Sequence, residues 1–278
     1  MSRPRLLRAL AIAAALWLSA FEALAADRHF TLATTNAVDN TGLLEHLIPT
    51  FTWRTGIDVR VLAVGSGQAQ RLVRSGDADA LLLNDREAEL ALVAEGHGLE
   101  RDKLMYNDFV IVGPEADPAA IRGAETAPEA FARIAAVGAL FASAGDGGGA
   151  HRKERDIWAA AKIEPNEGNG DWYRDSGLGA GVALNAANDF AAYTLVDRGT
   201  WLAFANRADL NLLFDRDPAL FNQYGLLLVD PGRHPHVKAV EAQTFVIWLT
   251  SEEGQQAIAD YRLEGQQLFF PNALPPDQ

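Results

Sequence analysis

Four short turns, rich in glycine and small hydroxyl residues, are the part of this sequence best suited to binding chemistry. Each follows a predicted strand or loop and precedes a predicted helix. The first amides of a helix lack internal partners and carry partial positive charge, and glycine lets a ligand approach them. If the turns meet, they predict a small cleft that binds an anion through backbone N–H groups. The candidate ligand-binding residues are Thr34, Thr35, Asn36, Ser66, Ser143, Gly145, Gly149 and Gly179.

The glycine run "SAGDGGGAH" (143–151) does not match the better-known nucleotide or catalytic motifs. It lacks the G-K-[ST] ending of a nucleotide P-loop, and "GLGAG" (177–181) lacks the full dinucleotide fingerprint. The sequence has no G-x-S-x-G nucleophile elbow. Ser143, Asp146 and His151 can be drawn as a triad, but closeness in sequence is not triad geometry. We therefore predict no catalytic residue and no cofactor.

Arg198, in the stretch "LVDRG", is the basic residue that we expect nearest to a ligand. The alternative is an ion pair with Asp197 or with a neighbouring lobe. His234 and His236 flank a proline, and we interpret them as surface histidines rather than metal ligands. The sequence therefore predicts no metal site.

Composition limits the classes of partner. The chain has 278 residues, a formal charge of -13 and 49% hydrophobic residues. A chain this acidic is not expected to bind nucleic acid through a broad basic face, although local amides can still hold a small anion. Cysteine is absent, which excludes disulfides and thiolate chemistry, so a hydrophobic core must stabilise the fold.

The N-terminus has the pattern of a cleaved secretory signal. Arg3, Arg5 and Arg8 precede an apolar run that ends in the A-x-A signal at residues 23–25. The run is short for a membrane span, although a retained amphipathic anchor is the alternative. We predict a signal peptide over residues 1–25, and no later segment is apolar enough to cross a bilayer.

The elements that must position the four turns alternate between strand and helix, which favours an α/β fold with a parallel sheet. The pattern predicts two closing helices over 237–263, with Ser251 as the cap between them. The predicted strands are 29–35, 57–65, 78–84, 108–114, 140–143 and 224–230. The other predicted helices are 42–51, 66–76, 86–96, 128–138, 151–163 and 179–190, with one more inside 191–205.

Stretches along nearly the whole mature chain resemble one family, the periplasmic tungstate-binding proteins of ABC importers (the TupA-like group). The most specific are "MYNDFVIVGP", "YTLVDRGT" and "WYRDSGLGAGVALNAAND". The resemblance implies a type II periplasmic binding protein fold, with two lobes and a ligand cleft between them. It implies crossings between the lobes near Gly113-Pro114 and Phe221. Lobe 1 would then hold 26–113 and 221–278, and lobe 2 would hold 114–220.

The ligand loops depart from the family pattern. The family's first loop reads T-T-T-S where this chain has Thr34-Thr35-Asn36-Ala37. Its middle loop reads S-R-G-D-D-S-G-T-H, so that Ala144 and Ala150 stand where the family has arginine and threonine. Each lost hydrogen bond to a charged ligand is worth about 1.5–3 kcal/mol. This predicts a changed ligand or weakened tungstate binding.

These observations predict a monomeric periplasmic solute-binding protein that delivers a small anion to an ABC permease in the inner membrane. The alternative is a sensory protein that presents its ligand state to a membrane receptor. A third hypothesis, an enzyme on a binding-protein scaffold, would depend on Asp146 and His151.

Overall fold

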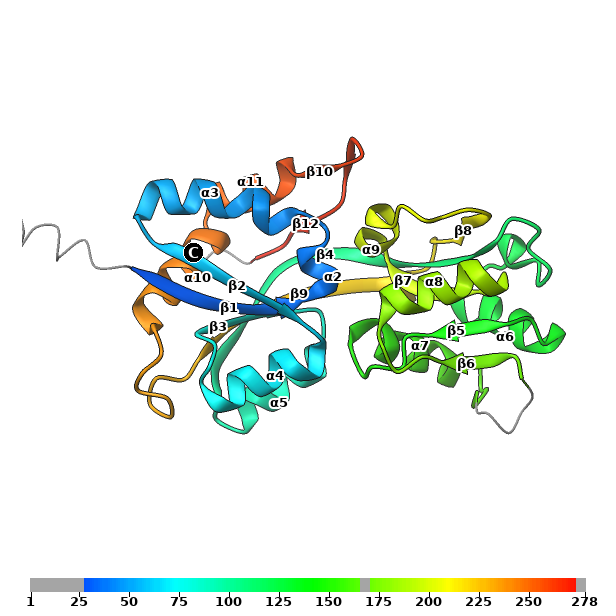
Figure 1. The fold of residues 1–278 in the computed structure, drawn as a ribbon, viewed down its shortest axis with the longest axis horizontal. Coiled ribbons are helices and arrows are strands. Elements are labelled where there is room, and N and C mark those ends of the chain that lie inside the picture. Colours follow the sequence, from blue (N-terminus) through cyan, green and yellow to red (C-terminus); the bar gives the residue numbers. More distant parts are fainter. Residues whose placement is uncertain (1–27, 166–170, 274–278) are drawn as a thin grey trace, which may run out of the picture.

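A computed structural model describes residues 28–165 and 171–273 of the chain. It has two lobes joined by two long strands, β4 (Gly98–Pro114) and β9 (Phe221–Val229), which run from one lobe into the other (Figure 1). The predicted signal peptide, residues 1–25, lies outside the described residues. Over the described ranges, no helix is long and apolar enough to cross a membrane.

Lobe 1 is built on a mixed sheet with the strand order β12-β4-β9-β3-β1-β2. The strand β1 pairs in parallel with β2 and β3, but β9 is antiparallel to both β3 and β4. The prediction of a parallel sheet was therefore wrong for this half of the sheet. The reason is that β9 returns from the second lobe and enters the sheet in the opposite direction. The remaining strands of this sheet are β1 (His29–Thr35), β2 (Asp58–Val64), β3 (Ala80–Leu83) and β12 (Phe270–Pro271).

Helices cover both faces of this sheet, so both sides of its strands are apolar. Leu32 and Leu82 belong to one buried cluster with Phe51 and Phe245 of α3 and α10, whereas Leu81 packs in another cluster on the opposite face. Ser251 caps α11 through Gly254, as predicted. The helices of lobe 1 are α2 (Asn36–Asp39), α3 (Leu43–Thr55), α4 (Ser66–Ser75), α5 (Arg86–Ala94), α10 (Ala239–Thr250) and α11 (Glu252–Asp260).

Lobe 2 surrounds an aromatic core in which Phe131, Phe141 and Trp158 pack with ring centroids 4.3 to 5.2 Å apart. The short strands β6, β7 and β8 were not predicted from the sequence, because each is held by pairing to a distant strand. The strands are β5 (Phe141–Ser143), β6 (Tyr173–Asp175), β7 (Thr194–Asp197) and β8 (Leu210–Phe214). The helices are α6 (Ala127–Val137), α7 (Gly149–Ala160), α8 (Ala180–Phe190) and α9 (Arg198–Ala203).

The strand β4 changes partners along its length. It pairs with β9 up to Asp108, and with β7 and β8 from Phe109 onward. It is also longer than the predicted strand 108–114. The lobe boundaries given above stay a prediction; the change of partner shows where β4 leaves the lobe 1 sheet. Short 3-10 turns and a small hairpin complete the fold: Ile121–Gly123, Pro218–Leu220, β10 (Arg262–Leu263) and β11 (Gln266–Gln267).

Candidate functional site

The four glycine turns lie next to one another where the two lobes meet. The parallel register of β1 and β2 sets Thr35 opposite Val64, which places the first two turns side by side. Across the lobes, a Cβ added to Gly148 would lie 3.3 Å from the Ser66 Cβ. The last turn joins them because the Gly179 N–H donates to the Ala144 carbonyl at 2.9 Å. The four turns therefore converge in the structure.

Three helix N-termini meet at this site without a side-chain cap. The helices α4, α7 and α8 begin after Gly65, Gly148 and Gly179, and none of these residues has a side chain that could satisfy the first amides. Among the other helices, α2, α5, α6, α9 and α11 are each capped by a Thr, Asp or Ser side chain, whereas α3 and α10 also lack a side-chain cap. Uncapped amides from three helices form a cradle for an anion.

The first turn offers the cradle mainly backbone. Thr34 is fully buried and its hydroxyl donates to the Leu82 carbonyl at 2.9 Å. The Thr35 hydroxyl accepts from the Val38 N–H at 3.3 Å and caps α2. Asn36 is exposed. The side chain of Thr34 is therefore engaged in the sheet, while the Thr35 hydroxyl hydrogen has no acceptor among the described residues.

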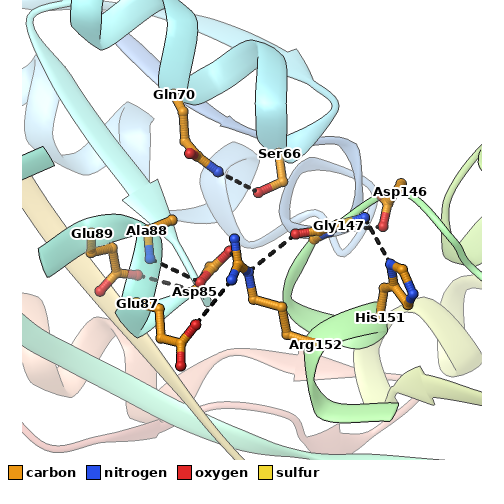
Figure 2. A network of polar contacts seen from close by, with 11 residues as sticks. Ser66, Gln70, Asp85, Glu87, Ala88, Glu89, Asp146, Gly147, His151 and Arg152 are labelled. Atoms are coloured by element: carbon orange, nitrogen blue, oxygen red, sulfur yellow. Dashed lines mark hydrogen bonds and ion pairs between the residues drawn. The ribbon is translucent and has the colours of Figure 1, made fainter. Parts of the chain in front are cut away.

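The two candidate serines differ in what their side chains reach. Ser66 stands at the start of α4, where Gln70 donates to its hydroxyl at 3.5 Å (Figure 2). Ser143 is fully buried beside Glu154, and its hydroxyl makes no well-aligned hydrogen bond among the described residues. Ser66 faces the meeting point of the turns, whereas Ser143 contributes its backbone there.

A buried carboxylate lies beneath the middle loop. Glu154 of α7 is 1% exposed and accepts a hydrogen bond from the Tyr173 hydroxyl at 2.8 Å. Burial raises the pKa of Glu154 to about 7, against the opposing effect of the Tyr173 hydroxyl and the nearby Ser143. This network connects β5, β6 and α7 under the cradle.

Gly145 is required by the geometry of the loop. Its φ is +63°, and an added Cβ would fall 1.5 Å from the Asp175 Oδ1 and 2.6 Å from the Gly177 nitrogen. Gly149 is also in close contact, because an added Cβ would lie 2.6 Å from the Asn84 carbonyl in lobe 1. Both predicted site residues therefore let chain segments approach closely. Gly145 does so within lobe 2, and Gly149 does so between the lobes.

Asp146 and His151 shape the loop through backbone contacts. The Asp146 carboxylate accepts from the Gly148 N–H at 2.9 Å, and the His151 Nδ1 accepts from the Gly147 N–H at 2.9 Å. Neither bonds to the buried Ser143. The triad drawn from the sequence is therefore not assembled.

Arg198 is held by two carboxylates. Its guanidinium donates to Asp108 at 2.6 and 2.5 Å and to Asp215 at 2.9 Å, and these contacts raise its pKa further. Asp108 lies at the end of the β4–β9 pairing, so Arg198 braces the crossing between the lobes. Its predicted role as a ligand contact stays a prediction, and the partner expected in the alternative, Asp197, instead caps α9 through Thr200.

An ion pair that was not predicted from the sequence joins the lobes beside the cradle. Arg152 of α7 donates to Asp85 at 2.7 Å and to Glu87 at 3.0 Å at the start of α5, and to the Gly147 carbonyl at 3.2 Å (Figure 2). The Asp85 side chain is 1% exposed, and burial raises its pKa. The only local signal in the sequence was the position of Asp85 as a helix cap.

Replacing Arg152 by methionine should weaken ligand binding at the cradle by about tenfold, because the closed arrangement would then bury the Asp85 carboxylate without a cation. Titration calorimetry with tungstate would measure the affinity. Glu87→Gln, at a side chain that is 82% exposed, should change it less than threefold, or about 0.6 kcal/mol. Equal affinity in Arg152→Met and the natural protein would exclude a role for this pair in closure.

Known proteins resemble this chain over most of its length. The family model described as a PBP superfamily domain matches residues 22–253. The tungstate-binding protein TupA of Peptoclostridium acidaminophilum is 41% identical over 248 residues, which are 87% of this chain and 85% of the relative. This chain belongs to the TupA-like family of periplasmic binding proteins.

Solved structures of this family share the fold. A tungstate-binding protein TupA from Desulfovibrio alaskensis is 41% identical, with a TM-score of 0.76, and covers 89% of this chain and 100% of its own. A tungstate ABC transporter structure from Geobacter sulfurreducens is 42% identical, with a TM-score of 0.78, and covers 84% of this chain and 98% of its own. The two-lobed type II fold predicted from the sequence is therefore confirmed, and this TupA-like protein is a substrate-binding component of ABC transport.

The three alanines that depart from the family pattern lie in different surroundings. Ala144 is 1% exposed, so an arginine would find no room there in the closed arrangement. Ala37 and Ala150 are half-buried, and Ala150 packs against the edge of the lobe 2 core. His234 and His236, which we predicted to be surface histidines, both make local contacts. His234 lies 3.4 Å from His97, and His236 contacts the Gly76 carbonyl. In the described part of the chain, no group of three or more His, Cys, Asp or Glu could hold a metal ion.

Proposed function

We propose that this TupA-like protein binds a tetrahedral oxyanion of the tungstate type through backbone amides, and that it does so more weakly than a protein with the full family set of side-chain donors. The observation that carries the proposal is the meeting of three uncapped helix N-termini across the lobes, with Ser66 and Gly148 in contact distance. Such a cradle needs no lysine or arginine, because the amides and the helix ends supply the positive potential.

The ligand-binding residues that we propose are those of the four turns. Thr35, Ser66 and the amides after Gly148 and Gly179 would contact the anion directly. Thr34, Ser143, Gly145 and Gly149 would fix the backbone, and Arg198 would brace the lobes. The names of the relatives support this ligand class, since they are called tungstate-binding proteins.

The protein is proposed to act in the periplasm, as a monomer that passes its ligand to an ABC permease of the inner membrane without chemical change. Export through a signal peptide over residues 1–25 fits this location. Closure would follow from contacts that the ligand makes with both lobes, because only a ligand that binds the closed arrangement better can shift the population toward it.

A restored hydroxyl tests the proposal. Ala150→Thr should bind tungstate about tenfold more tightly than the natural protein, because one hydrogen bond to a charged ligand is worth about 1.5 kcal/mol or more. Ala150→Val has the same shape without the hydroxyl and should show no gain. Titration calorimetry with tungstate, molybdate, sulfate and phosphate would give the affinities.

A charged variant provides the opposite test. Gly67→Glu places a carboxylate at the second residue of α4, where an added Cβ has only the Arg71 guanidinium within 4 Å, at 3.7 Å. Repulsion from this carboxylate should abolish oxyanion binding while the fold is retained. Oxyanion binding that is unchanged in Gly67→Glu would mean that the ligand lies elsewhere.

A further inference from the structure

A cavity lies between the lobes, beside the cradle and against the middle loop. It has a volume of about 670 Å³, and its walls come from the start of α5, from β4 and β9, and from the first turns of α7. Gly147 and Gly149 form part of its wall, and the Arg152 pair with Asp85 and Glu87 lies along it. We call this cavity the flank groove. Because both lobes line it, the groove is complete only in the closed arrangement.

The flank groove is basic although the chain is acidic. Its lining contains three acidic side chains, Asp85, Glu87 and Asp156, and twice as many cations. These cations are a quarter of the 24 Lys and Arg of a chain whose formal charge is -13. The lining is therefore locally positive, which favours an anion. The six cations are Arg86, Arg101, Lys103, Arg152, Lys153 and Arg155.

Two of the three acids that line the groove already have a partner. Arg152 binds Asp85 and Glu87, and the floor residue Arg101 binds the fully buried Glu89. The Arg101 side chain is 8% exposed and one of its terminal nitrogens, Nη2, has no hydrogen-bond acceptor among the described residues. Burial lowers the pKa of Lys153, and this effect outweighs the attraction of Asp156 and Asp217.

Three cations are left over. The side chains of Arg86, Lys103 and Arg155 make no ion pair or hydrogen bond with any residue in the described part of the chain. They come from α5, β4 and α7, and therefore from both lobes. Cations on three walls of a cavity much larger than a single tetrahedral oxyanion fit an anion with several charged groups, because each wall can then contact a different group.

We propose that the flank groove is a second anion-binding site, distinct from the cradle, for a small molecule that carries several negative groups, such as a linear polyphosphate. Arg86, Lys103 and Arg155 contact the anion, and Arg101 supplies positive potential from the floor. Because this anion would itself contact both lobes, it would favour the closed arrangement without the oxyanion, so that either proposal can fail without the other.

Titration calorimetry with tripolyphosphate at low ionic strength tests the site. The natural protein should bind one tripolyphosphate, with an affinity that falls steeply as salt is added. Lys103→Glu/Arg155→Glu should lose at least tenfold in affinity. The matched control Lys238→Glu/Arg216→Glu, which makes the same change of charge away from the groove, should lose less than threefold. Circular dichroism would confirm that each variant is folded.

Absence of tripolyphosphate binding by the natural protein would overturn the proposal. An equal loss of affinity in the control would also overturn it, because only net charge would then matter. Gly67→Glu, the cradle variant, should keep the tripolyphosphate affinity within threefold. A loss there as large as in Lys103→Glu/Arg155→Glu would place the anion in the cradle and refute a separate site.

Discussion

Gly145→Ala should destabilise the protein by about 4 kcal/mol and abolish oxyanion binding. The backbone at this position has φ +63°, a conformation that costs an L-residue about 1–2 kcal/mol. The added Cβ would also overlap the Asp175 carboxylate, 1.5 Å away, and crowd the Gly177 nitrogen at 2.6 Å. Overpacking of this kind costs a further 1–3 kcal/mol. The Asp175 Oδ1 cannot move away freely, because it accepts from the Gly177 N–H at 2.9 Å.

A control variant two residues further on separates the backbone cost from the cost of the overlap with Asp175. Gly147 has φ +70°, but an added Cβ would meet nothing within 4 Å. Gly147→Ala should therefore lose only the backbone cost of about 1–2 kcal/mol. Urea unfolding of the two variants would measure the difference. Equal destabilisation by the two variants would show that the contact with Asp175 adds no cost at position 145. The loop would then have a different geometry.

Glu154→Gln should make the protein more stable at pH 8 by about 3 kcal/mol and remove part of its pH dependence. The ordinary pKa of this carboxyl is 4.5, and burial raises it to about 7 in the folded protein. The folded state therefore binds the proton more tightly than the unfolded state. The contribution of the protonated carboxyl to stability is fully present below pH 4.5. It is lost as the pH rises toward 7, by about 1.4 kcal/mol for each pH unit between the two pKa values.

The glutamine keeps an acceptor for the Tyr173 hydroxyl but cannot ionise. We expect equal stabilities of variant and natural protein near pH 4.5 and a growing difference above it. Glu89 provides the contrast, since burial raises its pKa to about 7 as well, but it is paired with Arg101. Glu89→Gln leaves that buried guanidinium without its anion and should destabilise the protein at pH 8. Thermal unfolding from pH 4.5 to 8 would test both. If the stability of Glu154→Gln had the same pH dependence as that of the natural protein, the pKa of Glu154 would not differ between the folded and unfolded states.

Local features were predictable because they depend on neighbours in sequence. The period of the apolar residues and the cap residues placed most helices within two residues, as at α4, α5 and α6. The four glycine turns before helices were visible for the same reason. The short strands β6 and β8 were not, because a strand of three to five residues is stabilised by its partner rather than by its own sequence.

By itself, the sequence determined the α/β class, the positions of the turns and the resemblance to the TupA-like family. Only the tertiary structure decided which side chains face the ligand and which charges pair. Ser143 faces Glu154 rather than the cradle, and Arg198 pairs with Asp108, 90 residues away. Arg152 meets Asp85 at a separation of 67 residues. The physical reason is that Coulomb attraction and burial depend on distance in space, which the order of residues does not record until the lobes have folded and met.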